Sequence, residues 1–168
     1  MRRPVADRRD PSLARLRALQ DVSAPDAPAR IAEALKAAHG GVDVVVHNAG
    51  VTRDRTIAKM KRAHWDQAND INLGAVIAID EALIGQGVLR DGGRVVCLSS
   101  VAGIAGNMGQ TNYAASKAGI IGYVEALAPR GITVNAIAPS SEGSSPARTH
   151  AYLAGSKPLP ERPRLVRR

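Results

Sequence analysis

The sequence predicts an α/β fold built on a parallel β-sheet. Three short apolar runs, 42–47, 94–99 and 132–137, are rich in β-branched residues and have the length of buried parallel strands. Segments with helical periodicity separate them, and strands that alternate with helices form right-handed parallel sheets. The composition agrees with this prediction. Of the 168 residues 45% are hydrophobic but only 2% are aromatic, so the core must be built from Ala, Val, Ile and Leu.

Three helices are expected to accompany these strands. The first begins at Asp26, whose side chain can cap a helix N-terminus, and ends at Gly40. The second covers about residues 63–85, where apolar residues recur three and four positions apart. The third covers residues 112–128 and is ended by Pro129.

The chain divides into three parts by composition. Residues 1–20 are an Arg-rich arm, residues 21–139 are the folded domain, and residues 140–168 are a basic tail rich in Ser, Gly and Pro. We expect this tail to be disordered because it lacks apolar periodicity. The net charge of +8 comes from the two ends, since acidic and basic residues balance over 21–140. A nucleic-acid-binding protein would carry its positive charge on the folded domain, so no nucleic acid is expected as a partner.

Cysteine, histidine and hydropathy patterns exclude several further classes. Cys97 is the only cysteine and lies in an apolar run, which indicates a small buried side chain in a reducing compartment. No apolar stretch has the length of a signal peptide or a transmembrane helix. The four histidines show no metal-ligand spacing. We therefore expect a cytoplasmic protein with no membrane partner and no metal.

Tyr113 and Lys117 form the strongest candidate for a catalytic pair. They lie four residues apart on a predicted helix, so both side chains project from one face. A phenol ordinarily has a pKa of about 10, and a neighbouring ammonium group stabilises the phenolate and lowers that value. A tyrosine in this setting suits general acid catalysis toward a carbonyl group. Because a Tyr and a Lys also occur at this spacing by chance, the pair needs supporting residues.

Ser100 provides such support. It follows a predicted strand, and the carboxyl ends of strands in an open parallel sheet border the ligand crevice. Its hydroxyl can therefore hold a substrate oxygen. Ser99 is its neighbour, and we choose Ser100 by its spacing from Tyr113. The alternative for either serine is a loop residue that bonds only to the local backbone.

Five short motifs occur in a fixed order along the domain: HNAG at 47–50, IN at 71–72, SS at 99–100, YAASK at 113–117 and AP at 138–139. Together they resemble the short-chain dehydrogenase/reductase family. The longer stretches NAGVTRDRTIAKM and SSVAGIAGNMGQTNYAASKAG are most similar to 3-oxoacyl-acyl-carrier-protein reductases of the high-molecular-weight actinobacterial type. The resemblance implies a partial Rossmann-like, doubly wound parallel sheet of about three strands with flanking helices.

The resemblance also implies roles for individual residues. Tyr113 would be the catalytic acid, and Ser100 would orient the substrate carbonyl. Lys117 would bind the nicotinamide ribose and tune Tyr113. Asn72 would hold a water in a proton relay, although a polar residue that stabilises a helix irregularity is the alternative.

The resemblance implies that Tyr113 and Lys117 also contact the cofactor, and that the other cofactor-binding residues lie in two places. Asn48, Ala49 and Gly50 match the segment that lines the adenosine-ribose side of the nucleotide, and Gly50 allows close backbone approach. Asp21 and Val22 match, more weakly, the pair that contacts adenine. The implied cofactor is NADP, with NAD as the alternative.

Two parts of the family pattern have no counterpart in the chain. Nothing resembles the glycine-rich phosphate loop TGxxxGIG or the C-terminal segment that closes over the substrate. We therefore expect a truncated member of the family with weakened binding of the dinucleotide phosphates. The first strand of the shortened sheet would be an uncovered edge.

Two functions stay open at this point. One is the NAD(P)H-dependent reduction of 3-oxoacyl thioesters in fatty acid biosynthesis, with acyl-carrier protein or acyl-CoA as the substrate and a homo-oligomer as the assembly. The other is an inactive fragment that acts at most through protein association. Arg130 and Arg90 are candidates for docking an acidic carrier protein, although an exposed arginine needs no such role.

Overall fold

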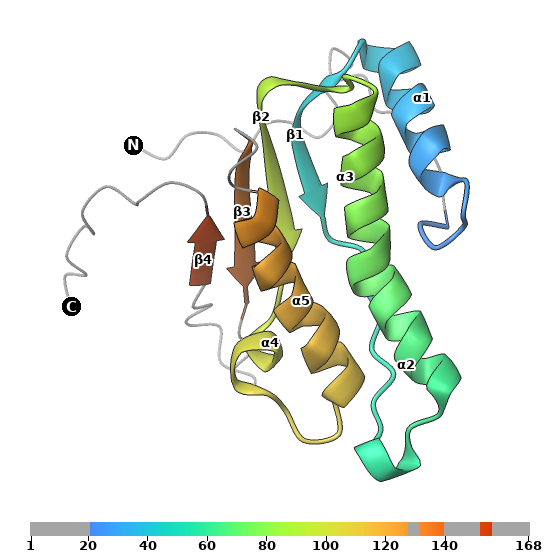
Figure 1. The fold of residues 1–168 in the computed structure, drawn as a ribbon, viewed down its shortest axis with the longest axis vertical. Helices are drawn as coiled ribbons and strands as arrows, with labels where there is room; N and C mark the ends of the chain where they lie inside the picture. The colour runs from blue at the N-terminus through green and yellow to red at the C-terminus, as the bar shows by residue number, and fades with distance from the viewer. Residues whose placement is uncertain (1–20, 128–131, 140–151, 156–168) are drawn as a thin grey trace, which may run out of the picture.

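The sheet matches the predicted arrangement of strands. The computed structural model describes residues 21–127, 132–139 and 152–155 (Figure 1). Strands β1 (Val42–His47), β2 (Leu89–Leu98) and β3 (Thr133–Ala138) are parallel neighbours in that order. This arrangement confirms the partial Rossmann-like sheet of three parallel strands.

A fourth strand corrects one prediction about the tail. Residues Tyr152–Gly155 form β4, which pairs antiparallel with β3. They lie in the segment 140–168 that we expected to be disordered, so that prediction is wrong for these four residues. Four residues are too few to show a strand periodicity in the sequence. Their pairing depends on the free hydrogen-bonding edge of β3, which only the folded sheet supplies.

Three long helical segments lie over one face of the sheet (Figure 1). Helix α1 covers Ala27–His39, and α5 covers Thr111–Leu127. The segment predicted as one helix over 63–85 consists of α2 (Arg62–Asn69), the π-helical turn η2 (Asp70–Gly74) and α3 (Ala75–Gly85). Two short helices, η1 (Ile57–Lys59) and α4 (Val101–Ala105), were not predicted, because neither is long enough to show a period.

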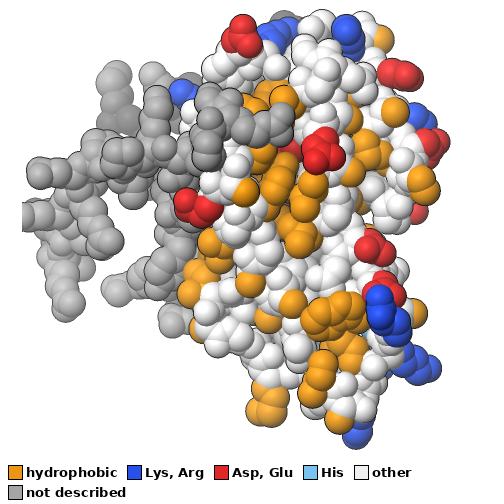
Figure 2. Space-filling view, viewed as in Figure 1, with side chains coloured by type: hydrophobic (Ala, Val, Ile, Leu, Met, Phe, Trp, Pro, Cys, Tyr) orange, Lys and Arg blue, Asp and Glu red, His pale blue; other side chains and the backbone are white. Residues whose placement is uncertain are grey.

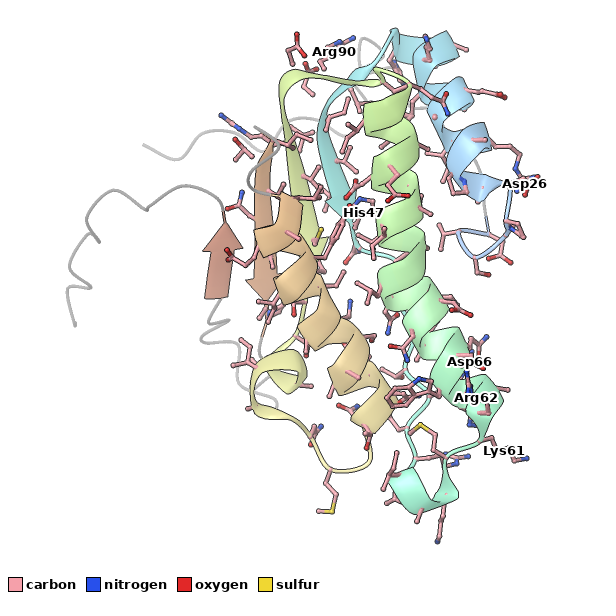
Figure 3. The ribbon with its side chains drawn as sticks, viewed as in Figure 1. Asp26, His47, Lys61, Arg62, Asp66 and Arg90 are labelled. Atoms are coloured by element: carbon pink, nitrogen blue, oxygen red, sulfur yellow. The ribbon has the colours of Figure 1, made fainter. Side chains whose placement is uncertain are left out.

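Asp26 occupies the N-cap position of α1 but does not cap the helix with its side chain. Its backbone is helical, with φ −92° and ψ −4°, whereas a capping residue is usually extended. Its carboxylate instead pairs with Arg30 at 3.2 Å, one turn along the exposed face (Figure 3). The start of the helix was predicted correctly, but the capping interaction was wrong.

The core lies between the sheet and the helices. One cluster joins strand residues to α3 and α5, and its buried members are Val76, Val95, Cys97, Ile120, Val124, Leu127, Val134 and Ala136. A second cluster joins α1 and α3 through Ala32, Ile79, Leu83 and Val88. Figure 2 shows further hydrophobic side chains on the helix-bearing face between scattered charged ones.

Strand β1 lies at an edge of the sheet, as predicted, but it is not buried on both faces. Val44 and Val46 are 55% and 57% exposed, while Val45 packs against both core clusters. In the described residues, helices therefore cover one face of β1 only. The prediction of a fully buried strand failed because an apolar run does not show whether its second face is covered.

The described ranges lack both a membrane-spanning helix and a metal-binding cluster. None of the helices described is long and apolar enough to cross a membrane. The same residues contain no group of three or more His, Cys, Asp or Glu side chains able to hold a metal ion.

Candidate active site

The candidate site lies where the three parallel strands end. Asn48 follows β1, Ser99 follows β2 and Pro139 follows β3. A pocket of about 330 Å³ opens between them and is lined by Asn48, Gly50, Val51, Thr52, Leu98, Ser99, Tyr113, Lys117 and Pro139. Ligands of open α/β sheets bind at such carboxyl-terminal strand ends.

The structure brings Tyr113 and Lys117 together on α5. The Lys117 Nζ atom lies 5.8 Å from the centroid of the Tyr113 ring. Lys117 is only 5% exposed, and its Nζ donates a hydrogen bond to the Leu98 carbonyl oxygen at 2.5 Å. Burial lowers the pKa of Lys117, and the nearby Cys97 thiol acts in the opposite direction. A largely desolvated amine therefore lies beside the phenol at the pocket wall.

The two candidate serines have different partners. Ser99 lines the pocket and is buried, and its hydroxyl donates a hydrogen bond to the Lys117 carbonyl oxygen at 2.7 Å. Ser100 is the N-cap of α4, where its Oγ accepts from the Ala102 amide at 3.2 Å. Ser99 thus fixes the backbone of α5 at Lys117. The Ser100 hydroxyl caps α4, and Ser100 follows the pocket-lining residue Ser99 in the chain.

Asn72 lies in the π-helical turn and connects three parts of the site. Its Oδ1 accepts from the Val51 amide at 2.8 Å, and its Nδ2 donates to the Val51 carbonyl and to Ser116 Oγ, both at 3.0 Å. Ser116 in turn donates to the Tyr113 carbonyl at 2.8 Å. Asn72 therefore ties the turn after β1 to the helix that carries Tyr113.

Two residues of this framework were missed in the sequence. Ser116, directly before Lys117, is fully buried between Asn72 and Tyr113. Asn112 is also fully buried; its Oδ1 accepts from the Tyr113 amide, and its Nδ2 donates to the carbonyls of Arg53 and His64. Their position within and beside YAASK was the only signal available, because their partners are distant in the sequence.

Gly50 provides a test of whether the pocket suits a nucleotide. A Cβ atom at this position would lie 3.2 Å from Asn72 Oδ1 and 3.6 Å from Lys117 Nζ. Because Gly50 has no side chain, the space between this turn and the Lys117 amine stays open and is bordered by polar atoms. A pocket of this volume with a few convergent polar groups fits a ribose with its attached ring.

The predicted adenine-side residues are partly brought together. Val22 lines a second pocket of about 210 Å³ together with Asn48 and Ala49. Asp21 is exposed, and its carboxylate accepts from the Ser23 hydroxyl at 2.7 Å and from the Ser23 amide at 3.0 Å. These bonds from Ser23 lower the pKa of Asp21. Val22 therefore lies beside the NAG turn, while Asp21 is engaged locally.

Of the two arginines considered for docking a carrier protein, Arg90 does not line the pocket. Arg90 lies near the start of β2, at the end of the sheet opposite to His47 and the site (Figure 3). It bonds to the Asp43 carboxylate at 2.7 Å and to the His39 carbonyl at 2.8 Å. Arg130 falls outside the described residues.

Helix α4 packs directly on the backbone of α5 at Gly103. A Cβ atom there would lie 2.7 Å from the Lys117 carbonyl carbon and 2.8 Å from the Ala118 nitrogen. Neither backbone atom can give way, so Gly103→Ala is expected to lower the free energy of unfolding by about 1–3 kcal/mol. Gly122→Ala is the matched control, since no atom lies within 4 Å of its Cβ position on α5. It should raise stability by about 0.5–1 kcal/mol. Urea unfolding measures both; equal effects of the two variants would refute the contact.

Comparison with known proteins places most of the chain in one family. The family model for short chain dehydrogenases matches residues 13–148. An acetoacetyl-CoA reductase of Acinetobacter sp. (strain RA3849) is 47% identical over 117 residues, which cover 67% of this chain and 47% of that protein. The 3-oxoacyl-acyl-carrier-protein reductase of Escherichia coli (strain K12) is 40% identical over 123 residues, covering 71% and 50%. Nodulation protein G of Azospirillum brasilense is 45% identical over 109 residues, covering 62% and 44%.

These matches confirm the family that the motifs indicated and the similarity to 3-oxoacyl-acyl-carrier-protein reductases. The chain spans about half the length of these relatives. The family match includes every candidate site residue from Asp21 to Lys117. The chain therefore belongs to the short-chain dehydrogenase family.

Proposed function

We infer that the chain carries the proton-transfer site of an NAD(P)H-dependent reductase of 3-oxoacyl thioesters. The observation that carries this proposal is the pocket at the strand ends, where Tyr113 and Lys117 are held together and Asn72 ties them to the turn after β1. The names of two relatives support the substrate class, because acetoacetyl-CoA and 3-oxoacyl-acyl-carrier protein are both 3-oxoacyl thioesters.

Each candidate residue has its own role in the proposed carbonyl reduction. The Tyr113 hydroxyl gives its proton to the carbonyl oxygen of the substrate, and the Ser100 hydroxyl orients that oxygen. Lys117 holds the ribose of the nucleotide and favours the phenolate that Tyr113 becomes. Asn72 keeps the relay aligned by holding Val51 and Ser116. The nicotinamide cofactor, when bound, supplies the hydride.

Nucleotide contacts are assigned to two groups of residues. We assign Asn48, Ala49 and Gly50 to the ribose side and Val22 with Asp21 to the adenine side. In support, Val22 lines one pocket with Asn48 and Ala49, and Gly50 lines the other with Asn48. NADP is the proposed cofactor, with NAD as the alternative. The proposed substrates are acyl-carrier-protein or acyl-CoA thioesters, the proposed assembly is a homo-oligomer, and the proposed compartment is the cytoplasm.

Titration of the purified full chain with NADPH and with NADH tests the cofactor, using the fluorescence of the reduced nicotinamide. Oxidation of the bound cofactor on addition of acetoacetyl-CoA then tests the substrate class. Binding followed by substrate-dependent oxidation is the expected result. Binding without oxidation would reject the thioester substrate, and absence of binding at millimolar cofactor would reject the enzyme in favour of an inactive association module.

A further inference from the structure

A buried carboxylate joins the three elements that build the site. Asp80 of α3 is 1% exposed and accepts a hydrogen bond from His47 Nε2 at 2.7 Å and from the Tyr123 hydroxyl at 3.1 Å. The His47 side chain is itself only 8% exposed and lies between β1 and α3 (Figure 3). Since a carboxylate only accepts hydrogen bonds, His47 carries its proton on Nε2 in this contact.

A carboxylate in this position needs both donors. Asp80 lies in the apolar helix α3, next to the core residue Ile79, where an ionised group without partners is strongly unfavourable. Neighbouring groups respond to it: burial and then the charge of Asp80 raise the pKa of Tyr123 and also that of Cys97. Losing one donor therefore leaves a buried carboxylate with one of its two hydrogen bonds unmade, and the surrounding elements must move to satisfy it.

The donors connect Asp80 to the candidate site at two points. His47 directly precedes Asn48, so its contact with α3 fixes the end of β1 from which the Asn48–Gly50 turn departs. Tyr123 lies on α5, the helix that carries Tyr113 and Lys117. Asp80 itself is on the helix that continues from the turn of Asn72. One carboxylate thus contacts the strand before the turn and the helix behind the pocket.

We propose that Asp80 is a positioning residue that uses His47 and Tyr123 to hold the cofactor-facing Asn48–Gly50 turn in place against helix α5. The expected effect of Asp80 on cofactor binding rests on the proposed function, whereas its effect on the position of the turn does not. Without the contact to His47, the C-terminal end of β1 keeps its pairing with β2, the packing of Val45 and the bonds of Val51 to Asn72, but it loses its hydrogen bond to α3. The turn is then free to shift away from Lys117.

Amide hydrogen exchange at Val51 provides the test, because this amide donates to Asn72 directly after the turn. His47→Leu is expected to speed exchange at Val51 by roughly tenfold more than at Val95 in the centre of the sheet. His47→Gln should restore the wild-type rate, since the Gln amide can reach the same carboxylate. Tyr123→Phe removes the weaker donor and is the milder variant if His47→Leu does not fold.

Val124→Ala is the matched control. Val124 is fully buried on α5 and its side chain has no hydrogen-bonding atom, so its truncation lowers stability without removing a hydrogen-bond donor from Asp80. Val124→Ala should raise the exchange rates at Val51 and Val95 equally. If His47→Leu and Tyr123→Phe do the same, the carboxylate only contributes to core stability and the proposal is overturned. A selective rise at Val51 that His47→Gln reverses would support it.

Cofactor affinity gives the second readout on the same proteins. If the wild type binds NADPH, its Kd should rise by about tenfold in His47→Leu and stay unchanged in Val124→Ala. An unchanged Kd in His47→Leu would overturn the claim that the turn is held for the cofactor. If the wild type does not bind NADPH, the proposed function fails, while the exchange rates at Val51 still decide whether Asp80 positions the turn.

Discussion

Tyr113→Phe is expected to lower kcat for acetoacetyl-CoA reduction by about 10²–10⁴-fold, the usual contribution of a general acid. Phe keeps the ring beside Lys117 and removes only the hydroxyl that we propose as the proton donor. Cofactor binding should therefore stay within about twofold of the wild type, because the ribose contacts are proposed for Lys117 and the turn after β1, which the substitution leaves in place. Steady-state kinetics and an NADPH titration measure the two quantities on one preparation.

Tyr123→Phe is the matched comparison for this prediction. It is the same chemical change on the same helix, but the Tyr123 hydroxyl bonds to Asp80 instead of facing the pocket. The two variants should differ in kind: Tyr113→Phe lowers kcat at constant Kd, whereas Tyr123→Phe raises the Kd for NADPH with a small change in kcat. Retention of more than about a tenth of the wild-type kcat in Tyr113→Phe would exclude it as the proton donor.

Local sequence patterns predicted the parts of the fold that depend on neighbours in the chain. The apolar run 42–47 coincides with β1, and the helical period over 63–85 coincides with α2, η2 and α3. The π-helical turn was not predicted, since it changes the helix by one residue without altering the apolar pattern. The strand β4 was missed because its only support is an edge formed elsewhere in the chain.

The candidate site shows the same division between local and distant contacts. Tyr113 and Lys117 share a helix face, so their spacing alone predicts their proximity. The contacts of Asp80 with His47 and Tyr123 span 33 and 43 residues, and those of Asn72 span 21 and 44. Hydrophobic periodicity in the sequence does not predict contacts between residues this far apart in the chain. Motif resemblance identified Asn72, but nothing in the sequence indicated Asp80.

Alkaline pH is expected to destabilise the folded protein through Cys97. This thiol is fully buried, and burial, followed by the charge of Asp80, raises its pKa from 9.0 to about 12, although Lys117 acts in the opposite direction. The unfolded chain ionises the thiol near pH 9, while the folded chain keeps it protonated until about pH 12. Stability from this group is thus complete below pH 9 and is lost as the pH rises toward 12. Three pKa units correspond to about 4 kcal/mol, a large part of a typical domain stability.

Cys97→Ala isolates this contribution, because the other shifted groups titrate in both proteins. The raised pKa of Tyr123 also removes stability at high pH, whereas the lowered pKa of Lys117 has the opposite sign. At neutral pH the variant should be less stable by about 1 kcal/mol, the cost of a small core truncation. Above pH 9 the wild type should lose stability faster, so the two curves of unfolding free energy against pH should cross between about pH 9 and 11. Parallel curves from urea unfolding across this range would show that the thiol ionises equally in both states and therefore is not shielded by the sheet and the helices above it.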